Sequence, residues 1–240
     1  TLHAFDGFRF AVYPRRGGRA PELDAPDTLE WMGRFIGRIH ALGATQAYQH
    51  RPTLDIASFG EAPREFLLSN NWIPADLEPA YRSVIDQALI GVRHCYERAG
   101  NIDLIRLHGD CHGGNVLWTD DGPHFVDFDD SRMGPAVQDL WMMLSGERAD
   151  QVHQMGDILA GYEDFFEFDP RQLHLIEALR TLRDNDGGPA LRGDGNRAAE
   201  DAGELQARRG RKRPIRGEPG AGKRGDPGGG RRVRGAMRAD

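Results

Sequence analysis

The sequence predicts an α+β protein: a short β-hairpin at the front, a mostly helical body, and a small β insertion within that body. Three observations support this class. Residues 2–13 alternate apolar and polar side chains around Asp6-Gly7, a dipeptide typical of tight hairpin turns. Long segments before and after the middle of the chain repeat apolar residues at helical spacing. Residues 104–128, in contrast, contain three short runs typical of strands.

Two long helices are expected in the first hundred residues. The first runs from Asp27, which is placed to cap it, to about residue 42, and Gly43 ends it. Its apolar stripe consists of Leu29, Met32, Ile36 and Ile39. The second runs from about residue 78 to residue 98, and its apolar stripe consists of Tyr81, Val84, Ile85, Ala88, Leu89 and Val92. The irregular stretch between them, residues 44–75, leaves room for one short helix around residues 64–68.

Three short strands and three helices are expected in the rest of the body. The strands are predicted at residues 104–107, 115–118 and 124–128, with a turn at residues 120–123 between the last two. The helices are predicted at about residues 135–145, 149–165 and 170–183.

The composition changes abruptly near residue 183. All 20 aromatic residues lie in residues 1–183, whereas residues 184–240 hold none and are rich in Gly and Arg. The net charge of −6 is divided into −11 for residues 1–183 and +5 for residues 184–240. Residues 184–240 hold too few large apolar side chains to offset the entropy lost on folding. We therefore expect this tail to be disordered or translated out of frame.

Several classes of protein are disfavoured by the composition. An acidic chain is a poor candidate for sequence-independent coating of nucleic acid, which needs a basic surface. The longest uninterrupted apolar run, residues 140–144, is far too short to cross a membrane. Two cysteines, Cys95 and Cys111, are too few for a disulfide framework, and no secretory leader opens the chain. We expect a cytoplasmic monomer without nucleic-acid or membrane partners.

The segment that carries chemistry lies between the predicted strands. It reads His108-Gly109-Asp110-Cys111-His112-Gly113-Gly114-Asn115, and Val126-Asp127 follows on the third strand. Phosphoryl transfer needs a carboxylate that orients the attacking hydroxyl and takes up its proton, and oxygen ligands for Mg²⁺ on the triphosphate. The H-x-D-x-x-x-x-N spacing supplies Asp110 and Asn115, and Asp127 supplies a further carboxylate. These residues therefore point to transfer of a phosphoryl group.

These motifs resemble the aminoglycoside phosphotransferase superfamily, whose members have a protein-kinase-like fold. The matching residues are His108-Gly109-Asp110 through Asn115, Val126-Asp127, Gly134-Pro135 and Asp139-Leu140. The fuller strings HGDCHGGNVLW…FVDFDDSRMGPAVQDLWMML, GFRFAVYPRRGGR and LEWMGRFIGRIHALG are similar to the bacterial stress response kinase A family, a Ser/Thr protein kinase branch of that superfamily. The resemblance covers roughly residues 1–183.

The resemblance implies a role for each matched residue of the body. Asp110 matches the catalytic base, and Asn115 and Asp127 match the ligands of Mg²⁺, so Asp110 and Asp127 are the expected catalytic residues. His108 matches a structural histidine of the same loop, and Asp139 matches a buried aspartate that braces it.

The front of the chain is expected to hold ATP. Ala11, Val12 and Tyr13 match the hinge, whose backbone would hydrogen-bond adenine. By this resemblance residues 1–13 are a remnant of the small lobe and hinge, and residues 14–183 are the large, mostly helical catalytic lobe. Kinase-like enzymes also need a Gly-rich loop and a lysine on the phosphates, yet residues 1–211 contain no lysine. We therefore expect this chain alone to be an inactive fragment of a Ser/Thr kinase.

Three alternatives remain. A small-molecule alcohol of the aminoglycoside or choline type is the second choice of acceptor, because the superfamily shares this loop across both substrate classes. A non-catalytic, pseudokinase-like binding module is favoured by the missing lysine and disfavoured by the intact set of Asp110, Asn115 and Asp127. Residues 109–113 also read as the opening of a two-metal phosphoesterase. That reading is disfavoured because the later histidines, which stand in neither His-x-His nor Asn-His pairs, are His124, His153 and His174.

Overall fold

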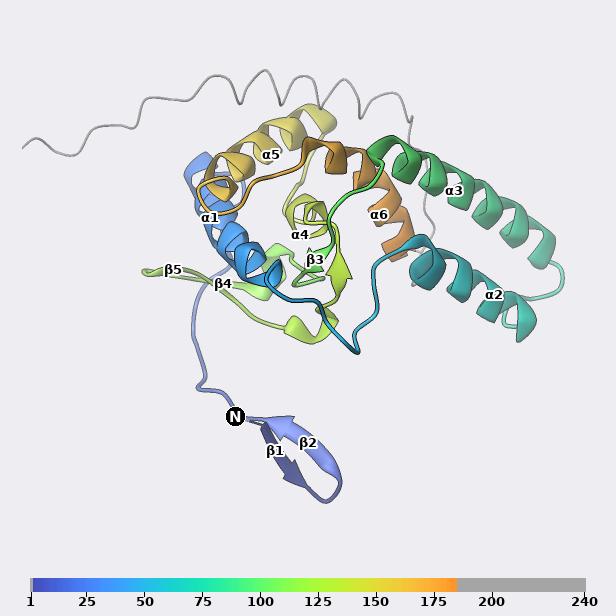
Figure 1. Ribbon diagram of the computed structural model, residues 1–240, viewed down its shortest axis with the longest axis horizontal. Helices are drawn as coiled ribbons and strands as arrows, with labels where there is room; N and C mark the ends of the chain where they lie inside the picture. The colour runs from blue at the N-terminus through green and yellow to red at the C-terminus, as the bar shows by residue number, and fades with distance from the viewer. Residues whose placement is uncertain (1, 185–240) are drawn as a thin grey trace, which may run out of the picture.

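Helices make up most of the molecule, with three two-stranded sheets beside them in the described residues (Figure 1). The structure is a computed structural model, and it describes residues 2–184. The helices are α1 (Pro26–Gly43), α2 (Ala62–Ser69), α3 (Glu78–Ala99), α4 (Val137–Trp141), α5 (Arg148–Tyr162) and α6 (Ile176–Asp184). The strands are β1 (Leu2–Phe5), β2 (Phe8–Ala11), β3 (Ile105–Arg106), β4 (Val116–Thr119), β5 (Gly122–Phe125) and β6 (Met133–Gly134). Shorter helical turns are η1 (Ala57–Glu61), η2 (Gly113–Asn115), η3 (Phe128–Asp130) and η4 (Pro170–Leu175).

Helices α1 and α5 lie side by side with their backbones in contact (Figure 1). Glycines allow this approach. A Cβ atom on Gly33 would lie 1.9 Å from the carbonyl oxygen of Ile158, and one on Gly161 would lie 1.9 Å from that of Glu30. Because carbon atoms do not come so close to carbonyl oxygens, any larger residue at either position would force the two helices apart.

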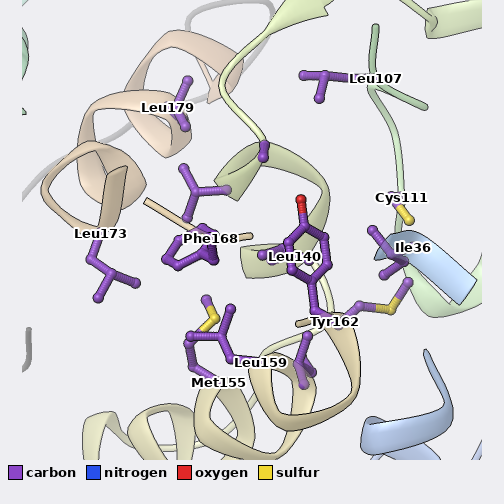
Figure 2. Close-up of a cluster of buried hydrophobic side chains, with 14 of the residues drawn as sticks. Ile36, Leu107, Cys111, Leu140, Met155, Leu159, Tyr162, Phe168, Leu173 and Leu179 are labelled. Atoms are coloured by element: carbon purple, nitrogen blue, oxygen red, sulfur yellow. The ribbon is translucent and has the colours of Figure 1, made fainter. Parts of the chain in front are cut away.

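The main core fills the space between α1, α4, α5, η4 and α6 (Figure 2). Its largest fully buried side chains are Leu29, Met32, Ile36, Leu140, Met143, Met155, Ile158, Tyr162, Phe168, Leu175 and Leu179. Each such side chain contributes about 1.5–3 kcal/mol by leaving water. A second cluster joins α3 to α6 through Ile85, Leu89, Val92, Ala178 and Leu182. Helix α6 therefore packs against both clusters and is fixed on two sides.

The front hairpin stands apart from the helical body (Figure 1). β1 and β2 pair antiparallel, with Phe5 opposite Phe8, and every residue of both strands is exposed. The turn residues Asp6 and Gly7 have φ angles of 47° and 81°, the left-handed conformation that such turns require. The hairpin predicted from Asp6-Gly7 is therefore confirmed.

The predicted helices and strands occur in the predicted order, but β6, which pairs antiparallel with β3, was missed in the sequence. Two details of α1 were also wrong. Asp27 is not the N-cap: Pro26 is already helical, Ala25 precedes it, and Asp27 lies in the first turn, where its charge favours the helix dipole. The buried face contains His40, whereas Ile39 is only partly buried. The 3.6-residue period continues from Met32 through Ile36 to His40, so periodicity decides the buried face even where the residue is polar.

The other differences concern the boundaries of elements that were predicted. Gly122 and Pro123, predicted as turn residues, already belong to β5, which pairs with β4. The helix predicted over residues 170–183 is divided into the 3₁₀ turn η4 and the α-helix α6. Among residues 2–184, no helix is long and apolar enough to cross a membrane. The tail expected to be disordered or out of frame lies outside the described residues, apart from Asp184.

The α1–α5 contact can be tested with two alanine substitutions. Gly33→Ala is expected to lower the free energy of unfolding by about 3 kcal/mol, because its methyl group meets a backbone that has no room to move. Gly91→Ala is the matched control: it lies on α3 with nothing within 4 Å of the added Cβ. That variant should be about 0.5–1 kcal/mol more stable than the parent, because alanine favours helix. Urea unfolding measures the change in unfolding free energy for both variants. Equal changes in the two variants would contradict the close contact between α1 and α5.

Candidate active site

A buried carboxylate holds the backbone of residues 108–115, here called the Asp110 loop. Asp139 of α4 is fully buried, and its Oδ2 accepts the N–H of His108 at 2.7 Å while its Oδ1 accepts the N–H of Gly109 at 2.9 Å. Oδ2 also accepts Nε2–H of His40 at 2.9 Å. One side chain therefore fixes the start of the loop to α1 and α4. This arrangement agrees with the bracing role expected for Asp139.

The hydrogen bonds that support the Asp110 loop continue from His40 to Tyr162 of α5. Nδ1 of His40 lies 2.8 Å from the Tyr162 hydroxyl, which donates to it when the imidazole is neutral. Burial, together with the charge of Asp139, raises the pKa of Tyr162. The tyrosine therefore stays protonated and remains a hydrogen-bond donor at neutral pH.

His108 links the Asp110 loop to the segment that carries Asp127. Its Nε2 donates to the carbonyl oxygen of Val126 at 2.8 Å, and its Nδ1 accepts the N–H of Asp110 at 3.3 Å. A carbonyl can only accept, so this pair of bonds selects the neutral tautomer with the proton on Nε2. The structural role expected for His108 agrees with these contacts.

Glycine is required in the loop just before Asp110. Gly109 has a φ angle of +89°, which side chains other than glycine rarely adopt. A Cβ atom there would lie 2.1 Å from the carbonyl oxygen of Asp130. On the other side of Asp110, burial raises the pKa of the Cys111 thiol well above its usual range, so this cysteine is a packed thiol.

The Asp110 carboxylate is held at both oxygens. Asn115 donates from Nδ2 to Oδ2 at 3.1 Å and to the carbonyl oxygen of Asp110 at 3.0 Å, while Arg183 of α6 donates to Oδ1 at 2.5 Å. Nε2 of His112 lies 3.4 Å from Oδ2. Partial burial by itself raises the pKa of Asp110, but Arg183, His112 and Asn115 outweigh it, so the pKa lies below the ordinary value. The carboxylate is therefore ionised at neutral pH.

A backbone hydrogen bond places Asp127 close to Asn115. The N–H of Val126 donates to the carbonyl oxygen of Asn115 at 3.0 Å, and Asp127 follows directly. β5 ends at Phe125, so Asp127 is not the strand end that was expected. It instead precedes η3 with φ 63° and ψ 64°, a left-handed conformation that is uncommon outside glycine and typical of functional sites.

The donor atoms of Asn115 and Asp127 suit a hard cation. The amide nitrogen of Asn115 is engaged with Asp110, which leaves its side-chain oxygen to face elsewhere. Carboxylate and amide oxygens are what Mg²⁺ prefers, and this ion keeps several waters and needs only one or two protein ligands. Within residues 2–184, no three His, Cys, Asp or Glu side chains are grouped closely enough to hold a metal ion. The residues present therefore fit Mg²⁺ with few protein ligands and do not fit a site built from many.

The expected hinge residues lie away from this loop. Ala11 is the last residue of β2, and Val12 and Tyr13 follow it without regular structure, all three exposed. Among residues 2–184, no hydrogen bond or ion pair joins them to the Asp110 loop. The structure thus brings Asp110, Asn115 and the Asp127 segment together and leaves residues 11–13 apart from them.

Comparison with known proteins identifies the family. Residues 1–176 match the phosphotransferase enzyme family, which is most of the chain. The chain belongs to this family. Stress response kinase A of Escherichia coli K12 is 44% identical over 183 residues, which cover 76% of this chain and 55% of that protein. The serine/threonine protein kinase RdoA of Salmonella typhimurium is 42% identical with the same coverage. The chain therefore spans about half the length of these curated relatives.

Solved structures confirm the protein-kinase-like fold of this phosphotransferase family member. Amicoumacin kinase hAmiN, in complex with AMP-PNP, Ca²⁺ and Ami, superposes with a TM-score of 0.54 at 18% identity, over 81% of this chain and 63% of that one. A choline/ethanolamine kinase family protein from Mesorhizobium loti superposes with a TM-score of 0.51 at 20% identity, over 89% of this chain and 74% of that one. At such identities the likeness shows the fold alone.

Inspection of the sequence did not identify His40, Tyr162 and Arg183, which contact the Asp110 loop or the residues that support it. The helical spacing of His40 from Met32 and Ile36 was a usable signal for its burial. Tyr162 and Arg183 reach the site from α5 and α6, and their positions in the chain carry no local signal for these contacts.

Substitution of Asp139 tests the support of the Asp110 loop. Asp139→Asn keeps the shape of the side chain but replaces one acceptor oxygen with an NH₂ group that faces existing donors. The free energy of unfolding should fall by about 3–5 kcal/mol. Asp120→Asn, on an exposed turn, is the control and should change it by less than about 0.5 kcal/mol. Similar stability of the two variants would show that the three hydrogen bonds contribute little.

The Tyr162 hydroxyl gives a pH-dependent test. Tyr162→Phe leaves Nδ1 of His40 without its partner and should cost about 1–3 kcal/mol near pH 7. Because the folded pKa of Tyr162 is raised, this contribution is present below the ordinary tyrosine pKa of about 10 and is lost as the pH rises above it. The difference in unfolding free energy between parent and variant should therefore narrow above about pH 10. If the difference in unfolding free energy between parent and variant stayed constant from pH 8 to pH 11, the predicted loss of the contribution from Tyr162 would be contradicted.

Proposed function

We propose that this chain is the catalytic part of an ATP-dependent phosphotransferase that moves the γ-phosphoryl group of ATP to a hydroxyl. The observation that carries the proposal is the arrangement around Asp110. An ionised carboxylate, bound to Asn115 five residues later, stands on a loop whose backbone is fixed by Asp139. Membership of the phosphotransferase enzyme family supports the same reaction class.

In this proposal each residue of the site has one task. Asp110 accepts a hydrogen bond from the acceptor hydroxyl, orients its oxygen, and takes up its proton as that oxygen bonds to the γ-phosphorus. The bond from the γ-phosphorus to the bridging oxygen of the β-phosphate breaks, and ADP leaves. Asn115 and Asp127 would hold Mg²⁺, which would neutralise negative charge on the phosphates. His108 and Asp139 keep the carboxylate of Asp110 and the segment of Asp127 in fixed register. Positioning of this kind supplies much of the rate enhancement in phosphoryl transfer.

The nucleotide would lie between the hairpin and the helical body. Ala11, Val12 and Tyr13 are exposed, and their backbone would supply donors and acceptors to adenine. By this proposal residues 1–13 belong to a small lobe and hinge, and residues 14–183 form the large lobe. We further propose that the protein is a cytoplasmic monomer whose partners are ATP and its acceptor.

The relatives' names favour a protein acceptor. The similar Escherichia coli and Salmonella proteins are named as a stress response kinase and a serine/threonine protein kinase. We therefore propose Ser/Thr hydroxyls of proteins as the acceptor and a role in stress response. Small-molecule alcohols are the second candidate, because the two solved structures of similar fold are named for such substrates.

Activity is best measured in a hybrid protein, because the chain spans about half the length of its relatives. Residues 2–184 replace the matched part of Escherichia coli stress response kinase A. Transfer of labelled phosphate from ATP to a generic protein substrate is then compared between the parent hybrid and its Asp110→Ala variant. The variant should lose about 10²–10⁴-fold in kcat, while its affinity for ATP with Mg²⁺ stays within about threefold. Asp120→Ala, on the exposed turn, is the control and should keep the parent rate.

The same assay separates the acceptors and the non-catalytic alternative. Label on Ser or Thr of the protein substrate supports the proposal, whereas label only on a panel of amino alcohols favours the small-molecule acceptor. A parent hybrid that binds ATP and transfers no phosphate to any acceptor would identify a binding module. Equal rates for the parent and Asp110→Ala would remove Asp110 from the mechanism.

A further inference from the structure

Asp110 receives its strongest contact from outside its own loop. A carboxylate offers about four lone-pair directions. In the described residues Arg183 occupies one on Oδ1 and Asn115 occupies one on Oδ2, and Nε2 of His112 lies 3.4 Å from Oδ2. Contacts on Oδ2 alone would leave the carboxylate free to turn about its Cβ–Cγ bond, whereas donors on both oxygens fix its plane. One lone pair on Oδ1 then remains available to an incoming hydroxyl.

The guanidinium of Arg183 is itself held in place. Its second terminal nitrogen, Nη1, lies 2.9 Å from the sulfur of Met142, just after α4. The neighbouring Leu182 is fully buried against α3, and Thr181 bonds the carbonyl oxygen of Glu177. Helix α6 therefore presents Arg183 from a packed backbone, although the Arg183 side chain is 40% exposed and the Asp110 side chain 20% exposed.

The other arginines near the loop have different partners. Arg132 bonds Asp130, and Arg51 bonds the carbonyl oxygen of Asp129. Arg180, one turn before Arg183 on α6, pairs with Glu177 and lies over the ring of Trp141. Within residues 2–184, Arg183 is thus the arginine that reaches the carboxylate of Asp110.

We propose that Arg183 is a positioning residue of this site, which fixes the plane of the Asp110 carboxylate from α6 so that one oxygen faces the acceptor hydroxyl. This inference rests on the proposed function, because it assigns Arg183 a task in the same transfer. Arg183 acts through Asp110 and does not itself take up a proton, since a guanidinium stays charged at any physiological pH.

The contact is tested first in the full 240-residue chain, without any need for activity. A double-mutant cycle combines Arg183→Ala and Asp110→Ala, and unfolding is followed in urea. A coupling of about two- to fivefold in the folding equilibrium constant is expected for such a partly exposed pair. The matched cycle of Arg180→Ala with Asp110→Ala should show no coupling. A coupling factor of one for Arg183 would overturn the inference.

The positioning role is tested in the hybrid protein described above. Arg183→Ala should lower kcat by about 10- to 100-fold and leave the KM for ATP unchanged, because the carboxylate is present but misoriented. Arg183→Lys should recover part of the loss, since it restores the charge without the planar fork. Arg180→Ala should keep the parent kcat. A kcat unchanged in Arg183→Ala, or a lysine variant no better than alanine, would overturn the positioning role.

The outcome also separates this inference from the function on which it rests. A parent hybrid without any transfer would overturn the proposed function, and the positioning role with it, whatever coupling the cycle shows. An active parent hybrid in which Arg183→Ala transfers phosphate at the parent rate would overturn the positioning role alone.

Discussion

The buried carboxylate of Asp139 is the interaction on which the candidate site depends. Taking an ionised carboxylate out of water costs several kcal/mol, and only well-placed donors offset that cost. Asp139 receives three donors, from His40 on α1 and from the backbone of His108 and Gly109. The hydrogen bonds stabilise the fold only when α1, α4 and the Asp110 loop are all in place. Formation of the helical core and formation of the site are therefore one event.

Asp139 and Asp110 have different roles in this arrangement. Asp139 is sealed from solvent and fully engaged, so its charge serves structure. Asp110 is partly exposed and retains unoccupied lone pairs in the described residues, so its charge is available to a ligand. Asp139 bonds the backbone of His108 and Gly109, the two residues directly before Asp110, yet the difference in burial gives the two carboxylates different roles. Gly109, directly before Asp110, has a positive φ that lets the backbone turn from the buried contact with Asp139 to the more exposed carboxylate of Asp110.

The sequence predicted what depends on local pattern. Asp6-Gly7 indicated the hairpin, apolar periodicity placed the long helices, and the spacing of Asp110 and Asn115 predicted their proximity, which the structure shows at 3.1 Å. Boundaries were less accurate where two local preferences compete, as where Pro26 begins α1 ahead of Asp27. The metal-binding and hinge roles of residues 11–13, 115 and 127 remain predictions, because they concern ligands and not the chain's own contacts.

The contacts that could not be predicted share one physical property: they join elements far apart in the sequence. Arg183 and Asp110 are 73 residues apart, and His40 and Tyr162 are 122 apart. No periodicity or spacing specifies such a pair, because its geometry is set by how α5 and α6 pack. Helix α6 shows this clearly, since Leu179 faces one apolar cluster and Leu182 the other. The apolar core thereby fixes the helix rotation that directs Arg183 at Asp110, so packing far from the loop determines the electrostatics within it.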